Sequence, residues 1–176
     1  MEKHYSQKYC VRTLIDLYCT EEWKSILKES EKTFSFQGGV TIFKEGEVAE
    51  HVIILKKGKV KVYSFVDKEK EQILRLVSDD QILGHRAFGG GFKLPVSATT
   101  LTQCDLVYIP VDLFLGALKA NSDFCFQFMM FFAEELKNSE QHIKLKGAKN
   151  LNQRVATAIL DNVAAFGYSS FDQKTL

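Results

Sequence analysis

The sequence contains no stretch long and apolar enough to cross a bilayer, which takes about 20 residues, and its N-terminus has no apolar run behind its charges. It has no charge surplus either. The 23 basic and 22 acidic residues leave a net charge of +1, so the bulk charge indicates neither nucleic acid nor an anionic membrane as a partner. We therefore expect a cytoplasmic protein without a membrane partner.

The sequence also lacks the cysteine pattern of a disulfide-stabilised protein. There is no C-x-x-C pair, and the four cysteines lie far apart, at Cys10, Cys19, Cys104 and Cys125. This low density predicts reduced thiols. With 176 residues, of which 45% are hydrophobic and 26% charged, the chain is long enough for one well-packed domain with an appendage.

Helix signals occupy residues 10–30. Thr20 is suited to cap a helix, with Glu21 and Glu22 in its first turn, where the helix dipole favours negative charge. The preceding Val11–Tyr18 either joins this helix or forms a separate one. We expect residues 1–32 to be an N-terminal helical segment that covers one end of the next domain.

From Thr33 the apolar residues alternate with a period of two, which is typical of β-strands. Turn residues separate short runs at spacings of roughly eight to twelve residues, without the βαβ rhythm of a parallel sheet. We therefore expect a mainly β fold, a sandwich or jelly roll, over residues 33–110. A charged hairpin is predicted at Val66–Glu71. The predicted strands, about eight in number, are Thr33–Phe36, Val40–Phe43, His51–Leu55, Val60–Phe65, Gln72–Val77, Ile82–Leu83, Val96–Leu101 and Leu106–Ile109.

Helices return in residues 111–149. A short amphipathic helix is predicted at Val111–Lys119, and Asn121 or Ser122 is suited to cap a much longer helix that runs to about Lys146. The remaining segment, residues 150–176, is predicted to hold a hinge, a helix and the start of a linker. Asn150 or Asn152 is suited to cap this helix, and Gly167 is its expected end.

The long helix is apolar nearly all round in its first half, so it needs two partners. Its own β domain supplies one, and the same helix of a second copy is the simplest other. A step of three and four residues, as in a coiled coil, marks the predicted dimer interface. Its members are Met129, Phe132, Leu136, Ser139 and Ile143. A monomer with this helix folded fully onto its own sheet is the alternative.

A glycine-rich loop, Ile82–Ala98, lies between two of the predicted strands. It turns at Gly84, passes through a short helix-capable piece, reaches three glycines at residues 89–91 and is stopped by Pro95. Successive glycines let backbone N–H groups converge on a bound group, and a helical turn points further donors the same way. The loop is thus a candidate ligand site, with a flexible hairpin connection as the alternative.

Three motifs resemble the strand, turn and hinge motifs of the Crp/Fnr family of bacterial transcription regulators: Val40–Glu47, Ile54–Tyr63 and Asn152–Ala156. The resemblance covers about residues 20–167. It implies a double-stranded β-helix, or jelly roll, like a cyclic-nucleotide-binding domain, with an N-terminal helix and a long C-terminal dimerisation helix.

The same resemblance implies a homodimer that senses an effector and transmits the signal through the hinge to a winged helix-turn-helix domain. Residues 168–176 are too few to supply that domain. We therefore expect this chain to lack it, and to contact DNA only through it. RNA polymerase is the implied partner of the full-length protein.

In family members that bind cyclic AMP, the loop carries a Glu after its glycine and an Arg near its end. Here the matching positions hold His85 and, approximately, Val96. A buried cyclic phosphate without a guanidinium would cost several kcal/mol. Arg86 and Lys93 do not stand at the matching place, so the loop argues against cyclic AMP.

The resemblance also implies which residues line the effector pocket: Gly84, His85, Arg86, Ala87, Phe88, Lys93, Val96, Ser97, Ser139 and Glu140. Haem remains a candidate, because His85 resembles the haem ligand of the gas-sensing branch of the family. A loop histidine is, however, more commonly exposed or hydrogen-bonded. An iron–sulfur cluster needs four thiolates, three of them closely spaced near the N-terminus, and the sequence does not supply that spacing. The effector stays unassigned.

Two other function classes remain as alternatives. A free-standing cyclic-nucleotide-binding module, as in channels and kinases, would not need the hinge motif. A cupin-type metalloenzyme would need a His-x-His pair, a Glu and a later His around one metal. The four histidines are instead scattered, at His4, His51, His85 and His142, so we expect neither a metal site nor an enzyme.

Overall fold

The computed structural model describes residues 10–66, 70–148 and 150–167. The chain forms two compact units, Met1–Gln127 and Phe128–Leu176. The middle of the charged hairpin, residues 67–69, and the predicted linker at residues 168–176 lie outside the described residues.

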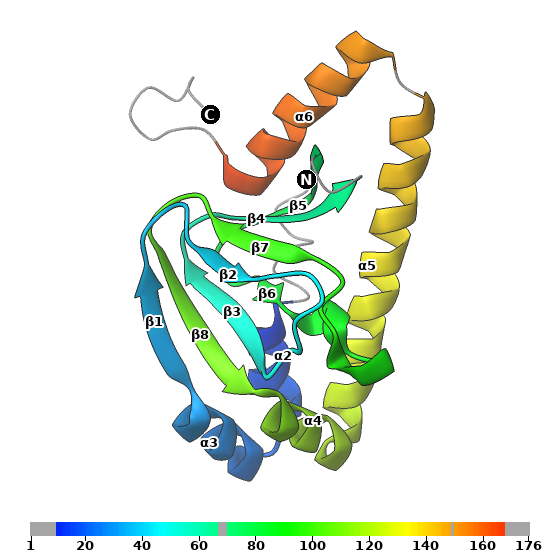
Figure 1. Ribbon diagram of the computed structural model, residues 1–176. Coiled ribbons are helices and arrows are strands. Elements are labelled where there is room, and N and C mark those ends of the chain that lie inside the picture. The colour runs from blue at the N-terminus through cyan, green and yellow to red at the C-terminus, as the bar shows by residue number, and fades with distance from the viewer. Residues whose placement is uncertain (1–9, 67–69, 149, 168–176) are drawn as a thin grey trace. The chain divides into compact units, whose positions relative to one another are not determined.

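Among the described residues of the first unit, eight strands form two antiparallel four-stranded sheets (Figure 1). The first sheet has the order β1-β8-β3-β6 and the second the order β2-β7-β4-β5. This confirms the predicted strands, with ends that differ by at most two residues. The strands are β1 (Lys32–Phe36), β2 (Thr41–Phe43), β3 (His51–Lys57), β4 (Val60–Val66), β5 (Lys70–Val77), β6 (Ile82–Leu83), β7 (Ser97–Thr100) and β8 (Cys104–Pro110).

The main core lies between the two sheets. In the first sheet Leu55 of β3 stands opposite Leu106 of β8, and in the second Val62 of β4 stands opposite Ala98 of β7. All four belong to one buried apolar cluster. Each fully buried Val or Leu side chain contributes about 1.5–3 kcal/mol relative to an exposed one, so this double layer stabilises the jelly roll that the sequence predicts.

The described part of the first unit also holds three shorter helices: α2 (Val11–Tyr18), α3 (Glu21–Ser30) and α4 (Val111–Ala120). Helix α2 is separate from α3, because the chain is extended at Cys19 and Thr20, and the Thr20 side chain accepts a hydrogen bond from Trp23 N. Helices α3 and α4 pack against each other and against β8 (Figure 1). A Cβ atom at Gly116 of α4 would approach the Trp23 ring to 2.7 Å, so this contact needs a glycine.

Asn121 connects these helices. Its backbone carbonyl accepts the hydrogen bond from Cys125 N that opens the next helix, as the predicted cap requires. Its buried side chain does something else, since Oδ1 accepts from Thr20 N at 2.8 Å and Nδ2 donates to Ala117 O at 2.8 Å. The residue thus joins the starts of α3 and α5 to the end of α4.

Two further helices follow, α5 (Ser122–Ala148) and α6 (Leu151–Phe166). Asn150, rather than Asn152, caps α6 through a capping box with Gln153, and α6 ends at Gly167 as predicted. Helix α5 is long, but within the described residues no helix combines the length and the apolar character that a membrane span requires.

We predict that Asn121→Ala lowers the free energy of unfolding by about 2 kcal/mol, because it leaves Thr20 N and Ala117 O without their side-chain partners. Ser25→Ala, at an exposed position of α3, is the matched control and should change stability by less than about 0.5 kcal/mol. Urea unfolding followed by circular dichroism measures both. Equal midpoints for the two variants would contradict the bridging role of Asn121.

Candidate functional site

The loop predicted to bind a ligand begins at β6, which pairs with β3. Gly84 has φ of +80°, and a Cβ atom there would approach His51 O to 3.3 Å, so a turn this tight needs glycine. A short 3-10 helix, η1 (His85–Ala87), follows. Its Ala87 side chain is buried and Arg86 is exposed, so the turn presents the arginine to solvent.

His85 is the residue whose environment differs most from expectation. Of the two expected environments, exposed or hydrogen-bonded, the first is wrong, because only 2% of the His85 surface is exposed. The reason is packing against the core. Leu83 before it and Ala87 after it are also buried, so η1 is held against the core on the side that carries His85.

The glycines at residues 89–91 lead into a second short 3-10 helix, η2 (Gly90–Phe92). The phenylalanines on either side pack together, with ring centroids of Phe88 and Phe92 6.1 Å apart, and Phe88 lies 6.0 Å from Phe114 of α4. Phe92 has φ of +55°, which is unusual for a bulky residue. The backbone N–H groups of Ala87, Phe88 and Phe92 donate to carbonyls within the loop, so these three are not aimed at a ligand.

The returning half of the loop is fixed to the turn between β2 and β3. Gly46 N donates to Leu94 O and Leu94 N donates to Glu47 O, both at 2.8 Å, and Ala49 N donates to Phe92 O at 2.8 Å. Ser97 adds a side-chain contact, because its buried hydroxyl accepts from Glu45 N at 3.0 Å. The loop is therefore anchored at both ends, which favours an ordered site over a flexible connection.

The structure thus brings most predicted pocket residues onto one loop. Gly84, His85, Arg86, Ala87 and Phe88 form its outgoing turn, and the returning part contains Lys93, Val96 and Ser97. Lys93 is exposed.

Val96 matters most for the ligand. It stands about where cyclic-AMP-binding members of the resembled family carry their Arg, and it is 7% exposed within the main core.

Two predicted pocket residues come from α5, in the second unit. Ser139 is half-buried and its hydroxyl donates to Glu135 O at 2.9 Å, which is a contact within the helix. Glu140 is exposed. That these two residues share a pocket with the loop stays a prediction.

Two polar contacts near the loop were not predicted from the sequence. Arg75 of β5 stands opposite Val62, and its guanidinium donates to Ile82 O at 3.4 Å, where the loop begins. A register shift in β5 hides this placement, because it breaks the alternation that would assign Arg75 to a face. The other contact joins Tyr63 Oη and Thr99 Oγ1, which lie 3.3 Å apart in a buried position.

The cofactor candidates find little support in the residues described. His85 is 2% exposed, and its role as a haem ligand stays a prediction. Burial raises the pKa of the Cys19 thiol to about 11, which disfavours the thiolate that a cluster needs. Buried Cys104 donates to the carbonyls of Lys59 and Thr102. No three His, Cys, Asp or Glu side chains of the described residues are grouped to hold a metal ion.

Comparison with known proteins places this geometry in a family. The family model for the cyclic nucleotide-binding domain matches residues 33–121. The fumarate and nitrate reduction regulatory protein of Escherichia coli K12 is 23% identical over 146 residues, which are 82% of this chain and 57% of that protein. The chain therefore spans little more than half the length of this relative.

Two solved structures have a similar fold. The sensor domain of the transcriptional regulator DNR from Pseudomonas aeruginosa superposes with a TM-score of 0.63 at 17% identity, over 73% of this chain and 92% of that one. The catabolite activator protein of Thermus thermophilus gives a TM-score of 0.63 at 15% identity, over 76% and 62%. With the family model matching half of its length, the chain belongs to the cyclic nucleotide-binding domain family and carries the sensor domain of the Crp/Fnr type.

Proposed function

We propose that the chain senses an effector with its jelly roll and forms a homodimer through α5, as part of a Crp/Fnr-type regulator of transcription. The exposure of apolar side chains on α5 is the observation that supports the dimer. Met129 is 55% exposed, Leu136 62% and Ile143 71%. Large apolar side chains at this exposure along one helix are typical of a protein–protein contact.

The spacing of these residues supports a coiled coil, and we propose that its two helices run parallel. Met129, Leu136 and Ile143 recur every seven residues, and half-buried Phe132 and Ser139 stand three residues after the first two. Such a repeat keeps one stripe of a helix facing its partner. Other apolar residues of α5, Phe124 and Phe128, are already buried in the single chain, so they need no second copy to cover them.

The loop Ile82–Ala98 is the proposed effector site, and its chemistry argues against cyclic AMP. An apolar side chain in the core, that of Val96, cannot donate hydrogen bonds to a phosphate, and buried His85 replaces the Glu that would accept from the ribose. A signal received here would shift the packing of α5 against its twin and pass through the break between α5 and α6. We also propose that the whole regulator contacts DNA and RNA polymerase.

The remaining alternatives are a free-standing cyclic-nucleotide-binding module and an enzyme. The first should bind a cyclic nucleotide directly, so the titration below separates it from our proposal. A cupin-type enzyme has no support, because the family and the named relatives are binding and regulatory proteins. We propose that the chain has no catalytic activity.

Leu136→Glu should convert a dimer into a monomer, because two carboxylates would face each other across the apolar stripe. Asn138→Glu introduces the same charge at an exposed position of α5 outside the stripe and should leave the dimer intact. Sedimentation equilibrium distinguishes the 20.0 kDa chain from its dimer. The dimer proposal fails if the wild-type protein is a monomer or if both variants stay dimeric.

Cyclic AMP should bind at least about a hundredfold more weakly than it binds a member with the Glu and Arg pair, since several kcal/mol of phosphate desolvation goes uncompensated. Isothermal titration calorimetry measures this, with a cyclic-AMP-binding protein of the same fold as positive control. A dissociation constant comparable with that of the control would contradict the proposed effector chemistry and favour the free-standing module.

A further inference from the structure

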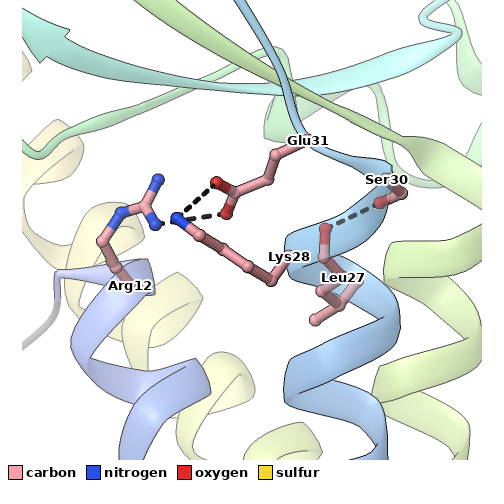
Figure 2. A network of polar contacts seen from close by, with 5 residues as sticks. All are labelled: Arg12, Leu27, Lys28, Ser30 and Glu31. Carbon is pink, nitrogen blue, oxygen red and sulfur yellow. Dashed lines mark hydrogen bonds and ion pairs between the residues drawn. The ribbon is translucent and has the colours of Figure 1, made fainter.

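The charged side chains between α2 and α3 are satisfied within one chain. Figure 2 shows Arg12 of α2 and Lys28 of α3 reaching the same carboxylate, that of Glu31. Arg12 Nη1 donates to Oε1 at 3.1 Å, and Lys28 Nζ donates to Oε2 at 3.3 Å. Lys24 donates to Glu21 at 2.7 Å in the same way. Each cation here has a carboxylate partner in its own chain, so this surface requires no second molecule.

The thiol on α5 has a different environment. All four cysteines lie among the described residues, and Cys125 is the one that is exposed. Burial raises the pKa of the Cys19 thiol to about 11. Buried Cys104 donates to two carbonyls, and half-buried Cys10 donates to Asp80 O at 3.3 Å. Because oxidation of a thiol requires access to it, Cys125 is the cysteine that an oxidant reaches most easily.

Cys125 stands in register with the apolar stripe of the proposed dimer. The stripe advances by alternating steps of three and four residues, from Met129 to Phe132 and on to Leu136, and the preceding step of four reaches Cys125. Residues at these steps share one face of a helix. Met129 is 55% exposed and Leu136 62%. The face that carries the exposed thiol therefore also carries the apolar side chains that one chain leaves uncovered.

A second copy of α5 supplies the reaction partner for this thiol. In a homodimer with two-fold symmetry both chains contribute the same patch, so a residue at the axis meets its own counterpart. Parallel helices in register bring every member of such a stripe close to that axis. Two Cys125 residues there come within the Cα separation of roughly 4.4–6.8 Å that a disulfide needs. The apolar stripe, and not the cysteine alone, thus identifies what the thiol reacts with.

We propose that Cys125 is a redox-sensitive modification site, at which a peroxide links two copies of the chain through a disulfide. With hydrogen peroxide, one Cys125 sulfur attacks an oxygen, the O–O bond breaks, and a sulfenic acid and one water form. The second Cys125 sulfur attacks the first, a second water leaves, and the S–S bond is complete. The two thiols lose two electrons and two protons in total, which the peroxide takes up.

This inference rests on the proposed α5 dimer and adds a form of regulation to it. The reduced dimer dissociates on dilution, whereas a covalent link makes reassociation of the two helices intramolecular, at an effective concentration on the order of 1 mM. An oxidant therefore holds α5 paired without any ligand in the jelly roll.

The test is to treat the reduced protein with a slight excess of hydrogen peroxide and to measure the covalent dimer on a non-reducing gel. The wild-type protein should give a linked dimer of the 20.0 kDa chain, and peptide mapping should show Cys125 joined to Cys125. Cys125→Ser should form at least about tenfold less covalent dimer, because its other thiols are not held near their counterparts. The position is exposed, so this change should not unfold the chain.

A displaced thiol is the matched control. In the Cys125→Ser background, Asp123→Cys places an exposed thiol in the same turn of α5 but outside the stripe. It should cross-link at least about tenfold more slowly than the wild-type protein. Equal rates would indicate random collision and overturn the proposal, as would a disulfide through Cys10 or one within a single chain.

Sedimentation in reducing buffer separates this inference from the dimer on which it rests. A reduced protein that is dimeric but does not cross-link through Cys125 would overturn the redox site and leave the proposed dimer intact. A reduced monomer that does not cross-link would overturn both.

Discussion

Two apolar sheet faces bury each other in the first unit, and this packing positions its strands and loops. Leu55 and Leu106 from one sheet and Val62 and Ala98 from the other belong to the same buried cluster. Because side chains alternate along a strand, this core fixes the register of every strand that contributes to it. The loop Ile82–Ala98 begins and ends in such strands, and its position is therefore set by the packing of the core rather than by its glycines.

The same constraint shapes the chemistry of the candidate site. Val96 faces the core, so this part of the loop offers hydrocarbon where a phosphate would need a cation. His85 is likewise turned inward. The exposed charges of the loop, Arg86 and Lys93, lie where solvent can reach them. An effector of this sensor would therefore have to be recognised by a different set of groups from those that hold cyclic AMP, while the fold that carries the signal is retained.

Local patterns predicted the elements well, and long-range contacts account for what they missed. Runs in which apolar residues alternate with polar ones, separated by glycine turns, predicted the strands. Thr20 and Asn150 were recognisable as helix caps and Gly167 as a helix end. The burial of His85, in contrast, depends on packing across the fold. The Asn121 side chain bonds to a backbone group 101 residues away, and Arg12 pairs with Glu31, 19 residues further along the chain. No sequence period encodes such contacts.

In the proposed homodimer, α5 pairs in parallel with the same helix of a second copy, and disulfide trapping can detect this arrangement. A disulfide needs Cα atoms roughly 4.4–6.8 Å apart, which two identical positions meet only at the centre of an in-register parallel pair. In a Cys125→Ser background, Leu136→Cys should cross-link rapidly into a covalent dimer on mild oxidation, and Asn138→Cys should not. Equal cross-linking of the two variants, or none in either, would contradict the account.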